Sequence, residues 1–460
     1  MNIKILVSNV QHINKQEISF DLSKNKLLCI AGKNSVGKTT LIRAIRNLSI
    51  NSTFQDTAAP YIFNENSKIS YSVDGLAENI EFTYNKLLKS IDSKQEIPEE
   101  LKSLISVELP IPHGERFNHF SRLSDIDEAL RAKISIGDYS IPLDLISFLE
   151  SVYGDSRFEN LKQVDIKRVS YYFILKDEIE RYYIREDYFS SGEYFVINLF
   201  KQIQQGKKLI VIDEIDISLD ASAQVNLVRV LREYCDKYET NIVFTTHSLA
   251  LMKTLNDEEL HYMERNQDRD CVTVTSRSYN FVKSVMYGFT GFDKYILTED
   301  KCLEEYMDYI ISSSTNDNFF KHLIIYVAGG SQVVDLLSRN TDKKFLSESE
   351  NVVAALDGDQ SDERFIQDRN DILLLPFSSI EKAIYDCYLN GDDKIPRVDS
   401  IEGGNVSKKA KNLFWKLTKK VHTGVPLMSK ASIYAYLEEL NPGGVKEFRQ
   451  QLTSFLNPDR

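Results

Sequence analysis

Residues 27–40 read LLCIAGKNSVGKTT, an apolar run followed by a glycine-rich turn. The turn, from Gly32 to Thr39, fits the pattern G-x-x-x-x-G-K-[ST]. In this pattern backbone N–H groups surround phosphate oxygens, the lysine reaches the terminal phosphates and the hydroxyl binds Mg²⁺. The apolar run predicts a strand, and TLIRAIRNL predicts a helix over 40–48 whose N-terminus favours an anion. We therefore expect a nucleotide site formed by Gly32, Asn34, Ser35, Gly37, Lys38, Thr39 and Thr40.

The second motif is LIVIDEID at residues 209–216, an apolar run that ends in carboxylates. Such a run predicts a buried strand, and the carboxyl ends of strands flank the nucleotide in sheets of this kind. We expect Asp213 to hold Mg²⁺ through water and Glu214 to polarise the water that attacks the γ-phosphate. ATP and Mg²⁺ are therefore the cofactors that the two motifs predict.

Three shorter motifs narrow the class. Ser190-Ser191-Gly192-Glu193 opens a predicted helix, Ser218-Leu219-Asp220 follows the LIVIDE strand, and Thr246-His247-Ser248 ends the predicted strand TNIVFTTHS. In this order the five motifs resemble the ABC-type ATPases, of the branch that includes SMC and DNA-repair enzymes. The resemblance covers residues 1–260, and SSGE departs from the commoner LSGGQ form.

This resemblance implies an α/β P-loop fold and a sandwich dimer. In such a dimer residues 190–193 of one subunit would close on the γ-phosphate held by the other. Asp220 would communicate across the interface, and His247 would touch the γ-phosphate. The residues between Thr39 and Ser190 carry no sustained heptad repeat, so we expect compact dimerisation or sensing elements there instead of a long coiled-coil arm.

A second group of carboxylates lies in another α/β pattern, which begins near Lys294. Strands are predicted in YILTED, HLIIYVAGG, NVVAALDGD and ILLLPF, with a helix between each pair. Carboxylates that converge at strand ends can bind two Mg²⁺ ions, which activate a water and stabilise the leaving oxygen of a phosphodiester. Hard oxygen ligands suit Mg²⁺ or Mn²⁺ better than zinc. We therefore predict a metal site formed by Glu299, Asp357, Asp359 and Glu381.

The glycine pair Gly329-Gly330, on a strand between these acids, completes a resemblance to the Toprim fold of topoisomerases, primases and a group of nucleases. The resemblance implies that Glu299, which matches the family's first-strand Glu, and Asp357 and Asp359, which match its DxD acids, are metal ligands. In the OLD nucleases a later Glu also binds metal; Glu381 matches it, and Lys382 could aid catalysis.

One position departs from this family pattern. Many of these nucleases carry a second acid four residues after the first-strand Glu, where this chain has Leu303. Asp300 or Glu304 could substitute for that acid, and the sequence leaves the choice open.

The region 401–460 is predicted to be helical and is basic, with ten Lys and Arg against five Asp and Glu. Within it, KKAKNLFWKLTKK at 408–420 has six lysines and no acid. Lysines can neutralise phosphates and aromatic rings can stack on bases, so this stretch is a candidate DNA contact. The alternative is a solvated amphipathic helix whose Phe414 and Trp415 face the core. The candidate DNA-binding residues are Lys408, Lys409, Lys411, Trp415, Lys416, Lys419 and Lys420.

Length and composition set the remaining limits. The 460 residues predict an ABC-type ATPase domain at 1–290, with an insertion at about 50–175, a Toprim domain at 291–400 and the basic extension at 401–460. Five scattered cysteines without a CxxC pair argue against a disulfide framework and a zinc site. With no apolar stretch of membrane-spanning length, we expect a cytoplasmic protein that does not bind membranes. The net charge of −12 argues against a protein that coats nucleic acid with a wholly basic surface, but it allows a local basic surface.

An ABC-type ATPase joined to a Toprim domain is similar to the OLD family of nucleases, which includes the nuclease subunit of the Gabija anti-phage system and effectors encoded beside retron reverse transcriptases. This implies a metal-dependent DNA endonuclease or nickase gated by nucleotide, acting in anti-phage defence on double-stranded DNA. The implied partners are a second copy of the chain, in a dimer or a tetramer, and a reverse transcriptase with its msDNA or another defence protein.

Two alternatives stay open. One is a non-nucleolytic ATP switch that binds DNA or a partner effector, and the other is a DNA-processing enzyme of the topoisomerase or primase kind.

Overall fold

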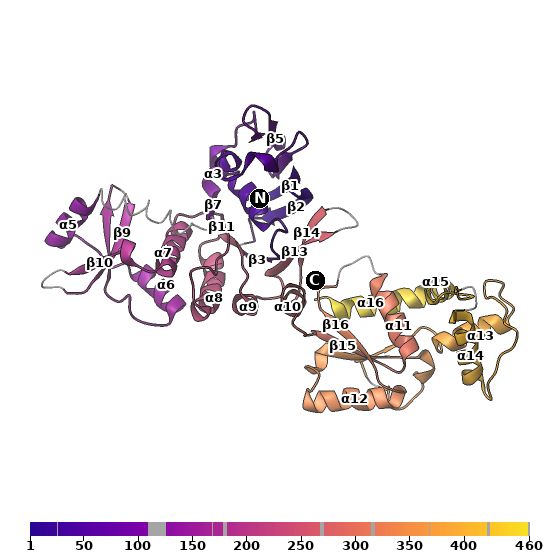
Figure 1. Cartoon of the computed structure of the whole chain (residues 1–460). Coiled ribbons are helices and arrows are strands. Elements are labelled where there is room, and N and C mark those ends of the chain that lie inside the picture. Colours follow the sequence, from indigo (N-terminus) through magenta and orange to yellow (C-terminus); the bar gives the residue numbers. More distant parts are fainter. Residues whose placement is uncertain are drawn as a thin grey trace. The chain divides into compact units, whose positions relative to one another are not determined.

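The computed structural model describes residues 1–24, 26–108, 126–167, 169–177, 182–266, 271–313, 318–367, 369–420 and 424–458. The chain divides into two units, Met1–Val282 and Lys283–Arg460, and the division falls within helix α10, Tyr279–Tyr287 (Figure 1). In the described part of the chain, none of the helices combines the length and apolar content needed to cross a membrane.

The first unit is built on an eleven-stranded mixed sheet with the order β6-β5-β4-β1-β2-β14-β13-β3-β12-β11-β7. Its strands are β1 (Asn2–Val10), β2 (Ile13–Asp21), β3 (Leu27–Ala31), β4 (Lys68–Val73), β5 (Ile80–Asn85), β6 (Ser90–Asp92), β7 (Ile105–Glu108), β11 (Leu209–Ile212), β12 (Asn241–Thr245), β13 (Leu260–Asn266) and β14 (Cys271–Ser276). The helices with it are α1 (Lys38–Arg46), α2 (Thr53–Thr57), α3 (Glu99–Leu104), α7 (Ser191–Gln204), α8 (Ala221–Lys237) and α9 (Leu249–Met252), with a 3₁₀ turn at Pro60–Ile62.

The strands that carry the motifs are neighbours and run parallel. β3 pairs with β12, β12 with β11 and β11 with β7. Every residue of β11 and β12 is buried, as expected for strands covered on both faces. Because these strands are parallel, their carboxyl ends lie at the same edge of the sheet. The segments that follow Ala31, Ile212 and Thr245 are therefore neighbours.

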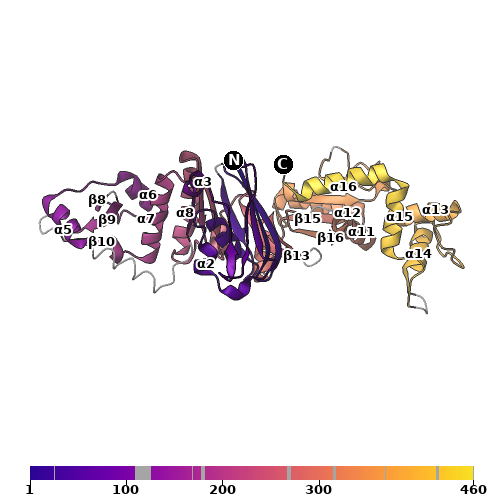
Figure 2. The ribbon, with the colours of Figure 1, turned by 90° about the horizontal axis from the view of Figure 1, so that it is seen from above.

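A smaller three-stranded sheet, β10-β9-β8, lies in the lobe that precedes α7. Helices α5 and α6 lie beside it (Figures 1 and 2). Leu130 and Ile134 of α5 share a core with Val164 and Phe173 of the sheet. The bounds are α5 (Asp127–Ile136), α6 (Leu143–Tyr153), β8 (Leu161–Ile166), β9 (Val169–Leu175), β10 (Tyr183–Arg185) and a 3₁₀ turn at Glu186–Tyr188.

The second unit has a parallel four-stranded sheet with the order β16-β15-β17-β18. Helices α15 and α16, at the yellow end of the chain, lie by α11 (Figure 2). Leu413, Ile433 and Leu437 of the last helices share one core with Ile296 and Tyr306. The bounds are β15 (Lys294–Thr298), α11 (Lys301–Ser312), β16 (His322–Tyr326), α12 (Gly330–Lys343), β17 (Val352–Leu356), β18 (Ile372–Leu374), α13 (Ile380–Leu389), α14 (Val406–Thr418), α15 (Lys430–Leu440) and α16 (Pro442–Leu456), with 3₁₀ turns at Ser349–Asn351 and Gly358–Gln360.

Two local sequence patterns differ from the structure. Taken by itself the stretch EELKSLISVEL, from residue 99 to 109, resembles one helix, but helix α3 ends at Leu104 and strand β7 begins at Ile105. The edge of β11 offers unpaired backbone groups, and the β-branched Ile105 and Val107 suit a strand there, so tertiary pairing overrides the local pattern. In the second unit β17 is followed by a 3₁₀ turn and not, among the described residues, by the α-helix expected before β18.

Candidate functional site

The phosphate-binding loop joins β3 to α1. Its backbone is left-handed at Ser35 (φ 61°) and at Gly37 (φ 113°), a conformation that only glycine adopts without strain. The Lys38 Nζ donates to the carbonyl oxygens of Gly32 at 2.7 Å and Lys33 at 3.1 Å, so the ammonium lies over its own loop. Burial lowers the pKa of Lys38, while nearby Asp213 and Glu214 oppose that shift. Of the other predicted loop residues Asn34, Ser35 and Thr39 are exposed, whereas Gly32 and Thr40 are buried.

Thr245 joins the two carboxylate residues that follow β11. Its hydroxyl donates to Asp213 Oδ1 at 2.5 Å and accepts from the backbone N–H of Glu214 at 2.8 Å. Glu214 is left-handed, with φ 56°, a costly conformation for a residue with a Cβ. Asp213 and Thr245 are buried. The sequence motif located both acids but gave no sign that a threonine on the next strand fixes their geometry.

His247 lies within electrostatic range of the same group. Its pKa is lowered by burial and then by the positive charge of Lys38, while Asp216, Glu214 and Asp213 act in the opposite direction. The imidazole is therefore neutral at pH 7. The structure thus brings together the phosphate-loop lysine, the two carboxylates after β11 and the histidine after β12.

The Ser190-Ser191-Gly192-Glu193 motif forms the N-terminus of α7. Ser190 Oγ accepts from the Glu193 N–H at 3.2 Å and Glu193 Oε2 accepts from the Ser190 N–H at 2.8 Å, which is a capping box. Arg157 Nη1 lies 3.4 Å from Glu193 Oε1. Asp220 caps α8 by accepting from the N–H groups of Ser222 and Ala223. Its role across a subunit interface stays a prediction.

Glu108 is a further acid at this edge of the sheet that sequence reasoning missed. It ends β7 beside Ile212, and the Asp213 N–H donates to its carbonyl oxygen at 3.0 Å. The Gln202 side chain on α7 donates to its carboxylate. Burial raises the pKa of Glu108, and the bond from Gln202 and the charge of Arg46 oppose the shift. No motif signals this position, because it depends on the pairing of β7 with β11.

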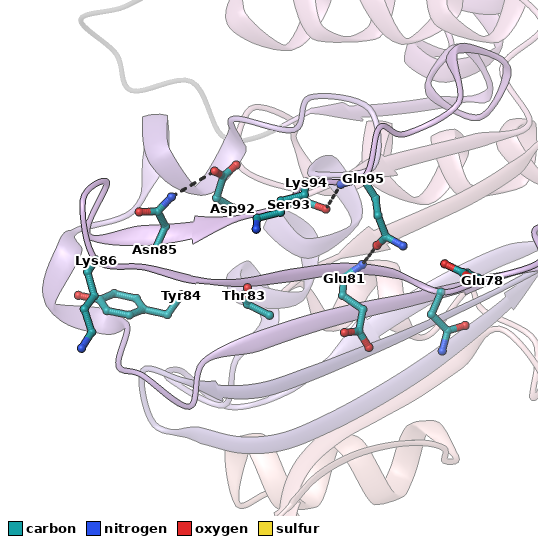
Figure 3. A pocket seen from close by; sticks show the side chains of 11 residues that line it. Glu78, Glu81, Thr83, Tyr84, Asn85, Lys86, Asp92, Ser93, Lys94 and Gln95 are labelled. Atoms are coloured by element: carbon teal, nitrogen blue, oxygen red, sulfur yellow. Dashed lines mark hydrogen bonds between the residues drawn. The ribbon is translucent and has the colours of Figure 1, made fainter.

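A pocket elsewhere in the first unit contains none of the predicted site residues. It lies along β5 and the segment that follows β6 (Figure 3). The ladder between these strands ends at Thr83 and Asp92, and the Gln95 side chain then accepts from the Glu81 N–H at 2.8 Å. The groove is therefore an opening at the edge of the sheet, and its polar lining gives no sign of catalytic chemistry.

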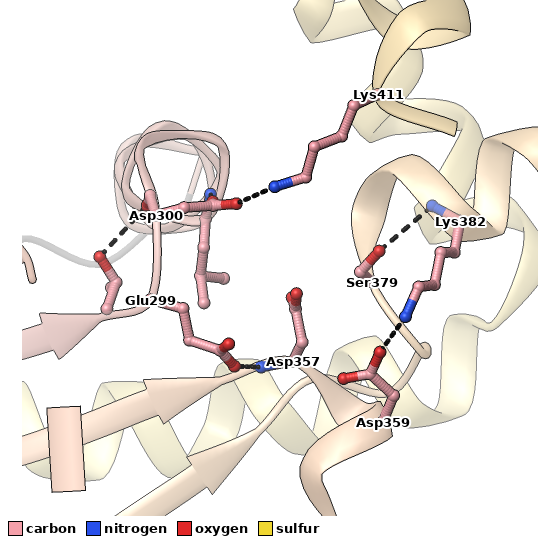
Figure 4. Close-up of polar contacts among 9 residues, drawn as sticks. Glu299, Asp300, Asp357, Asp359, Ser379, Lys382 and Lys411 are labelled. Atoms are coloured by element: carbon pink, nitrogen blue, oxygen red, sulfur yellow. Dashed lines mark hydrogen bonds and ion pairs between the residues drawn. The ribbon is translucent and has the colours of Figure 1, made fainter. Parts of the chain in front are cut away.

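The carboxylates of the second unit gather at the carboxyl edge of its parallel sheet. Glu299 follows β15 and its Oε1 accepts from the Asp357 N–H at 2.7 Å. Figure 4 shows the side chains of Glu299, Asp300 and Asp357 around one space, with Lys411 and Lys382 at its border. Lys382 forms an ion pair with Asp359, and Lys411 Nζ lies 3.5 Å from Asp300 Oδ2.

This clustering disfavours the charged forms of the acids. Burial, followed by the charges of Glu299, Asp300, Glu381 and Asp359, raises the pKa of Asp357 to about 8. Burial also raises the pKa of Glu381, with Asp300 as the next cause, and that of Glu299. The site therefore has a strong demand for compensating positive charge.

The structure bears on the choice between Asp300 and Glu304. Leu303 is buried in the core of the second unit, so its position offers the site no polar group. Asp300 caps α11 through the Leu303 N–H at 3.0 Å and pairs with Lys411 next to Glu381. Asp300 is thus the acid that geometry places at the site.

The carboxylates of this cluster are the kind of ligand that a divalent cation prefers, but they are not arranged as a metal site in the structure. The acids supply hard carboxylate oxygens, and their mutual repulsion would be relieved by a cation. Among the residues that the structure describes, no group of three or more His, Cys, Asp and Glu side chains is arranged as a metal site. Glu299 Oε1 accepts from a backbone N–H and Asp359 pairs with Lys382, and each carboxylate keeps further lone pairs with which it can bind a cation.

The basic stretch forms α14, which packs one face into the core through Ala410, Leu413 and Phe414. The burial of Phe414 agrees with the amphipathic alternative, whereas Trp415 is 55% exposed and Lys419 Nζ lies 4.2 Å from its ring centroid. Lys408, Lys411, Lys419 and Lys420 are exposed, Lys409 is half-buried, and Lys416 donates to Ser400. Contact with DNA stays a prediction, but Lys411 is linked to the carboxylates.

Comparison with known proteins gives a family match within the first unit. Residues 194–253 match the family described as "AAA domain, putative AbiEii toxin, Type IV TA system". The match contains Asp213, Glu214 and His247. Together with the phosphate loop and the strand order around it, it gives the first unit the α/β P-loop fold of ABC-type ATPases, with a large mixed sheet.

Curated relatives and solved structures are more distant. The Mycoplasma genitalium oligopeptide transport ATP-binding protein OppF is 26% identical over 115 residues, 24% of this chain and only 13% of that protein. The phosphonates import ATP-binding protein PhnC of Lactobacillus johnsonii is 22% identical over 245 residues, 53% of this chain and 78% of that protein. The SMC head domain from Thermotoga maritima is 14% identical, with a TM-score of 0.35, over 60% of this chain and 99% of that one. An SMC head bound to the C-winged helix domain of ScpA is 14% identical, with a TM-score of 0.41, over 60% of this chain and 97% of that one.

Proposed function

We propose that the chain is an ATP-binding and ATP-hydrolysing enzyme whose nucleotide cycle gates a metal-dependent DNA nuclease or nickase site in the second unit. The observation that carries the nuclease part is the cluster of Glu299, Asp357 and Glu381 with two lysines at the carboxyl edge of a parallel sheet. The ATPase part is supported by the phosphate loop, the Asp213–Thr245–Glu214 arrangement and the ATP-binding relatives.

In the first unit each group has a distinct task. Lys38 leaves the loop carbonyls and binds the β- and γ-phosphate oxygens, while Thr39 and Asp213 hold Mg²⁺. Glu214 accepts a proton from the attacking water, because Thr245 holds its backbone against Asp213. Neutral His247 donates a hydrogen bond to the γ-phosphate.

In the second unit the acids and lysines divide their roles by environment. Asp357, whose pKa is raised to about 8, holds a proton at neutral pH in the arrangement described. A divalent cation, held by Glu299, Asp357, Asp359 and Glu381, supplies an activated water and charge stabilisation when bound. Lys382 and Lys411 leave their acidic partners and bind phosphodiester oxygens of double-stranded DNA.

The resemblance to OLD nucleases extends the proposal to the cell. The chain would act in anti-phage defence, together with a partner such as a reverse transcriptase and its msDNA, in a homodimer or tetramer. A loss of protection against phage in cells that carry Asp357→Asn would support this role. Unchanged protection would contradict the role of the nuclease site in defence.

Plasmid cleavage by the full chain tests the proposed chemistry. We expect nicking or cutting that requires Mg²⁺ or Mn²⁺, disappears in Asp357→Asn and changes its response to ATP in Lys38→Ala. Asp371→Asn is a matched control, since that acid pairs with Arg369 away from the cluster. Cleavage that persists in Asp357→Asn would refute the site assignment, and ATP affinity that is unchanged in Lys38→Ala would refute the phosphate loop.

A non-nucleolytic ATP switch is the second candidate function. The core position of Leu303 favours it, because an acid is missing where many related nucleases carry one. DNA that stays intact while the chain binds it in an ATP-dependent manner would support the switch. A covalent protein–DNA adduct would instead indicate a topoisomerase-like reaction.

A further inference from the structure

The loop after β11 and the segment after β12 are held together by one carboxylate. Asp216 Oδ1 accepts a hydrogen bond from Thr246 Oγ1 at 2.6 Å and a longer one from the His247 N–H at 3.4 Å. Thr246 is fully buried. Bonds to a charged acceptor are stronger than neutral ones, so the backbone of His247 follows any movement of the Asp216 loop.

Gln224, in the first turn of α8, completes the same junction. Its Nε2 donates to the carbonyl oxygens of Asp216 at 3.2 Å and Leu219 at 2.8 Å. Its Oε1 accepts from Ser248 Oγ at 2.5 Å. The side chain is 8% exposed, and both amide N–H groups are used. One buried amide therefore ties together the loop before α8 and the segment that carries His247.

The other side of this loop touches the start of α7. A Cβ added at Gly192 would lie 2.4 Å from the carbonyl oxygen of Ser218 and 3.0 Å from Leu219 Cδ2. The helix end that bears the Ser-Ser-Gly-Glu motif is thus in direct contact with the loop that Gln224 holds. A continuous path runs from Gly192 through Ser218 and Leu219 to Gln224 and then to Ser248, next to His247.

We propose that Gln224 is a positioning residue that couples the Ser190–Glu193 turn of a chain to His247 of the same chain. The inference rests on the proposed ATPase function. In a dimer in which that turn closes on the partner's nucleotide while His247 serves its own, the coupling makes hydrolysis at the two nucleotides interdependent. Closure of one site presses Gly192 on the loop, and Gln224 transmits the displacement to the other site.

ATP hydrolysis by the full chain carrying Gln224→Glu tests this coupling. The carboxylate keeps the volume of the amide but cannot donate to the two carbonyl oxygens. We expect kcat to fall about tenfold and the Hill coefficient for ATP to fall toward one, as loss of a typical coupling free energy would give. Half-saturation should stay within about twofold, because the phosphate loop is untouched.

Two further variants separate coupling from folding. Gln224→Leu removes the same bonds without adding charge and should change the Hill coefficient in the same way. Gln55→Glu is a matched control on the exposed face of α2 and should leave kcat and the Hill coefficient unchanged. Thermal melting of each variant shows whether the fold is kept.

The outcomes distinguish this inference from the proposed function. Non-cooperative hydrolysis by the wild type, or a normal Hill coefficient in both Gln224 variants, overturns the coupling while leaving the ATPase assignment intact. A fall in kcat, half-saturation and melting temperature together, with the Hill coefficient unchanged, shows a structural role only and also overturns it. Hydrolysis that does not depend on Lys38 contradicts the proposed function itself, and the coupling falls with it.

Discussion

Replacing Thr245 by Val tests whether the hydroxyl between Asp213 and Glu214 sets the rate of ATP hydrolysis. Valine has nearly the same shape, so the change removes one oxygen and little packing. The lost oxygen donates to Asp213 at 2.5 Å and accepts from the Glu214 N–H at 2.8 Å. Without it the left-handed turn at Glu214 loses the bond that holds it, and a buried carboxylate loses its donor.

The expected magnitude follows from the kind of bond removed. A hydrogen bond to a charged group contributes about 1.5–3 kcal/mol, which corresponds to a roughly ten- to hundredfold fall in the rate of the chemical step. ATP affinity should change by less than about threefold, since Lys38 and the loop amides remain. A stability loss of about 1–3 kcal/mol is expected as well, or a melting temperature lower by roughly 2–10 °C.

Single-turnover hydrolysis measures this effect without product release. Thr245→Ser is the control that keeps the hydroxyl and removes only the methyl group, so its rate should stay near that of the wild type. A Thr245→Val rate within twofold of the wild type would refute the positioning argument. Equal losses in Thr245→Val and Thr245→Ser would show that packing, and not the hydroxyl, is responsible.

Three other predictions concern different parts of the chain. In the absence of divalent cations Asp357→Asn should raise the melting temperature, because it removes a buried acid whose pKa is raised by burial and by the neighbouring carboxylates; a lower melting temperature would contradict this unfavourable environment. With Mg²⁺ or Mn²⁺ present the same variant should lack plasmid cleavage. Gly192→Ala should abolish ATP hydrolysis but keep ATP binding, because its Cβ would meet the Ser218 carbonyl oxygen; hydrolysis at the wild-type rate would show that the contact is unimportant. Burial lowers the pKa of His261 to about 4 from its ordinary 6.5, so the unfolded chain takes up a proton first as pH falls, and stability should drop between pH 6.5 and pH 4. Between pH 7 and pH 5, protonation of His261 in the unfolded chain lowers the free energy of unfolding by about 2 kcal/mol, because the roughly 1.5 pH units from 6.5 to 5 count about 1.36 kcal/mol each. In urea unfolding, the free energy of unfolding of His261→Gln should therefore fall by about 2 kcal/mol less over this range than that of the wild type.

The sequence predicted those features that depend on contiguous residues. The glycine-rich turn, the apolar runs at Leu209–Ile212 and Asn241–Thr245, and the helix that Ser190-Ser191-Gly192-Glu193 opens lie where their patterns indicated. These patterns are strong because a strand covered on both faces must be apolar throughout, and a capped helix carries its own start signal. The match to an AAA family at residues 194–253 agrees with the ABC-type interpretation of the same motifs.

What the sequence could not predict depends on which strands and helices become neighbours. Strand β7 forms because the edge of β11 is open to it, and only that pairing makes Glu108 a neighbour of Asp213. Thr245 lies in a strand that the sequence predicted, β12. Its contact with Asp213, however, depends on the register between β11 and β12, which places its hydroxyl beside that carboxylate. Side-chain bonds of this kind join residues about thirty positions apart and leave no local pattern.

Lys411 shows how such a long-range contact changes the interpretation of a residue. By composition it is one of six lysines in a basic stretch, and the sequence, which predicted either a DNA contact or a solvated amphipathic helix, did not distinguish it from the other five. In the structure α14 packs on α13, and Lys411 alone among these lysines has an ion pair with an acid of the carboxylate cluster in the contacts described, at 3.5 Å from Asp300. Partial burial acts to lower the pKa of Lys411, but the charges of Glu381 and Asp300 outweigh it and raise that pKa, so the lysine stays charged and partly neutralises the cluster. Under the proposed function, a DNA phosphate that draws Lys411 away would increase the negative charge felt by Asp357 and strengthen the demand for a cation, so that binding of DNA would favour binding of a metal ion.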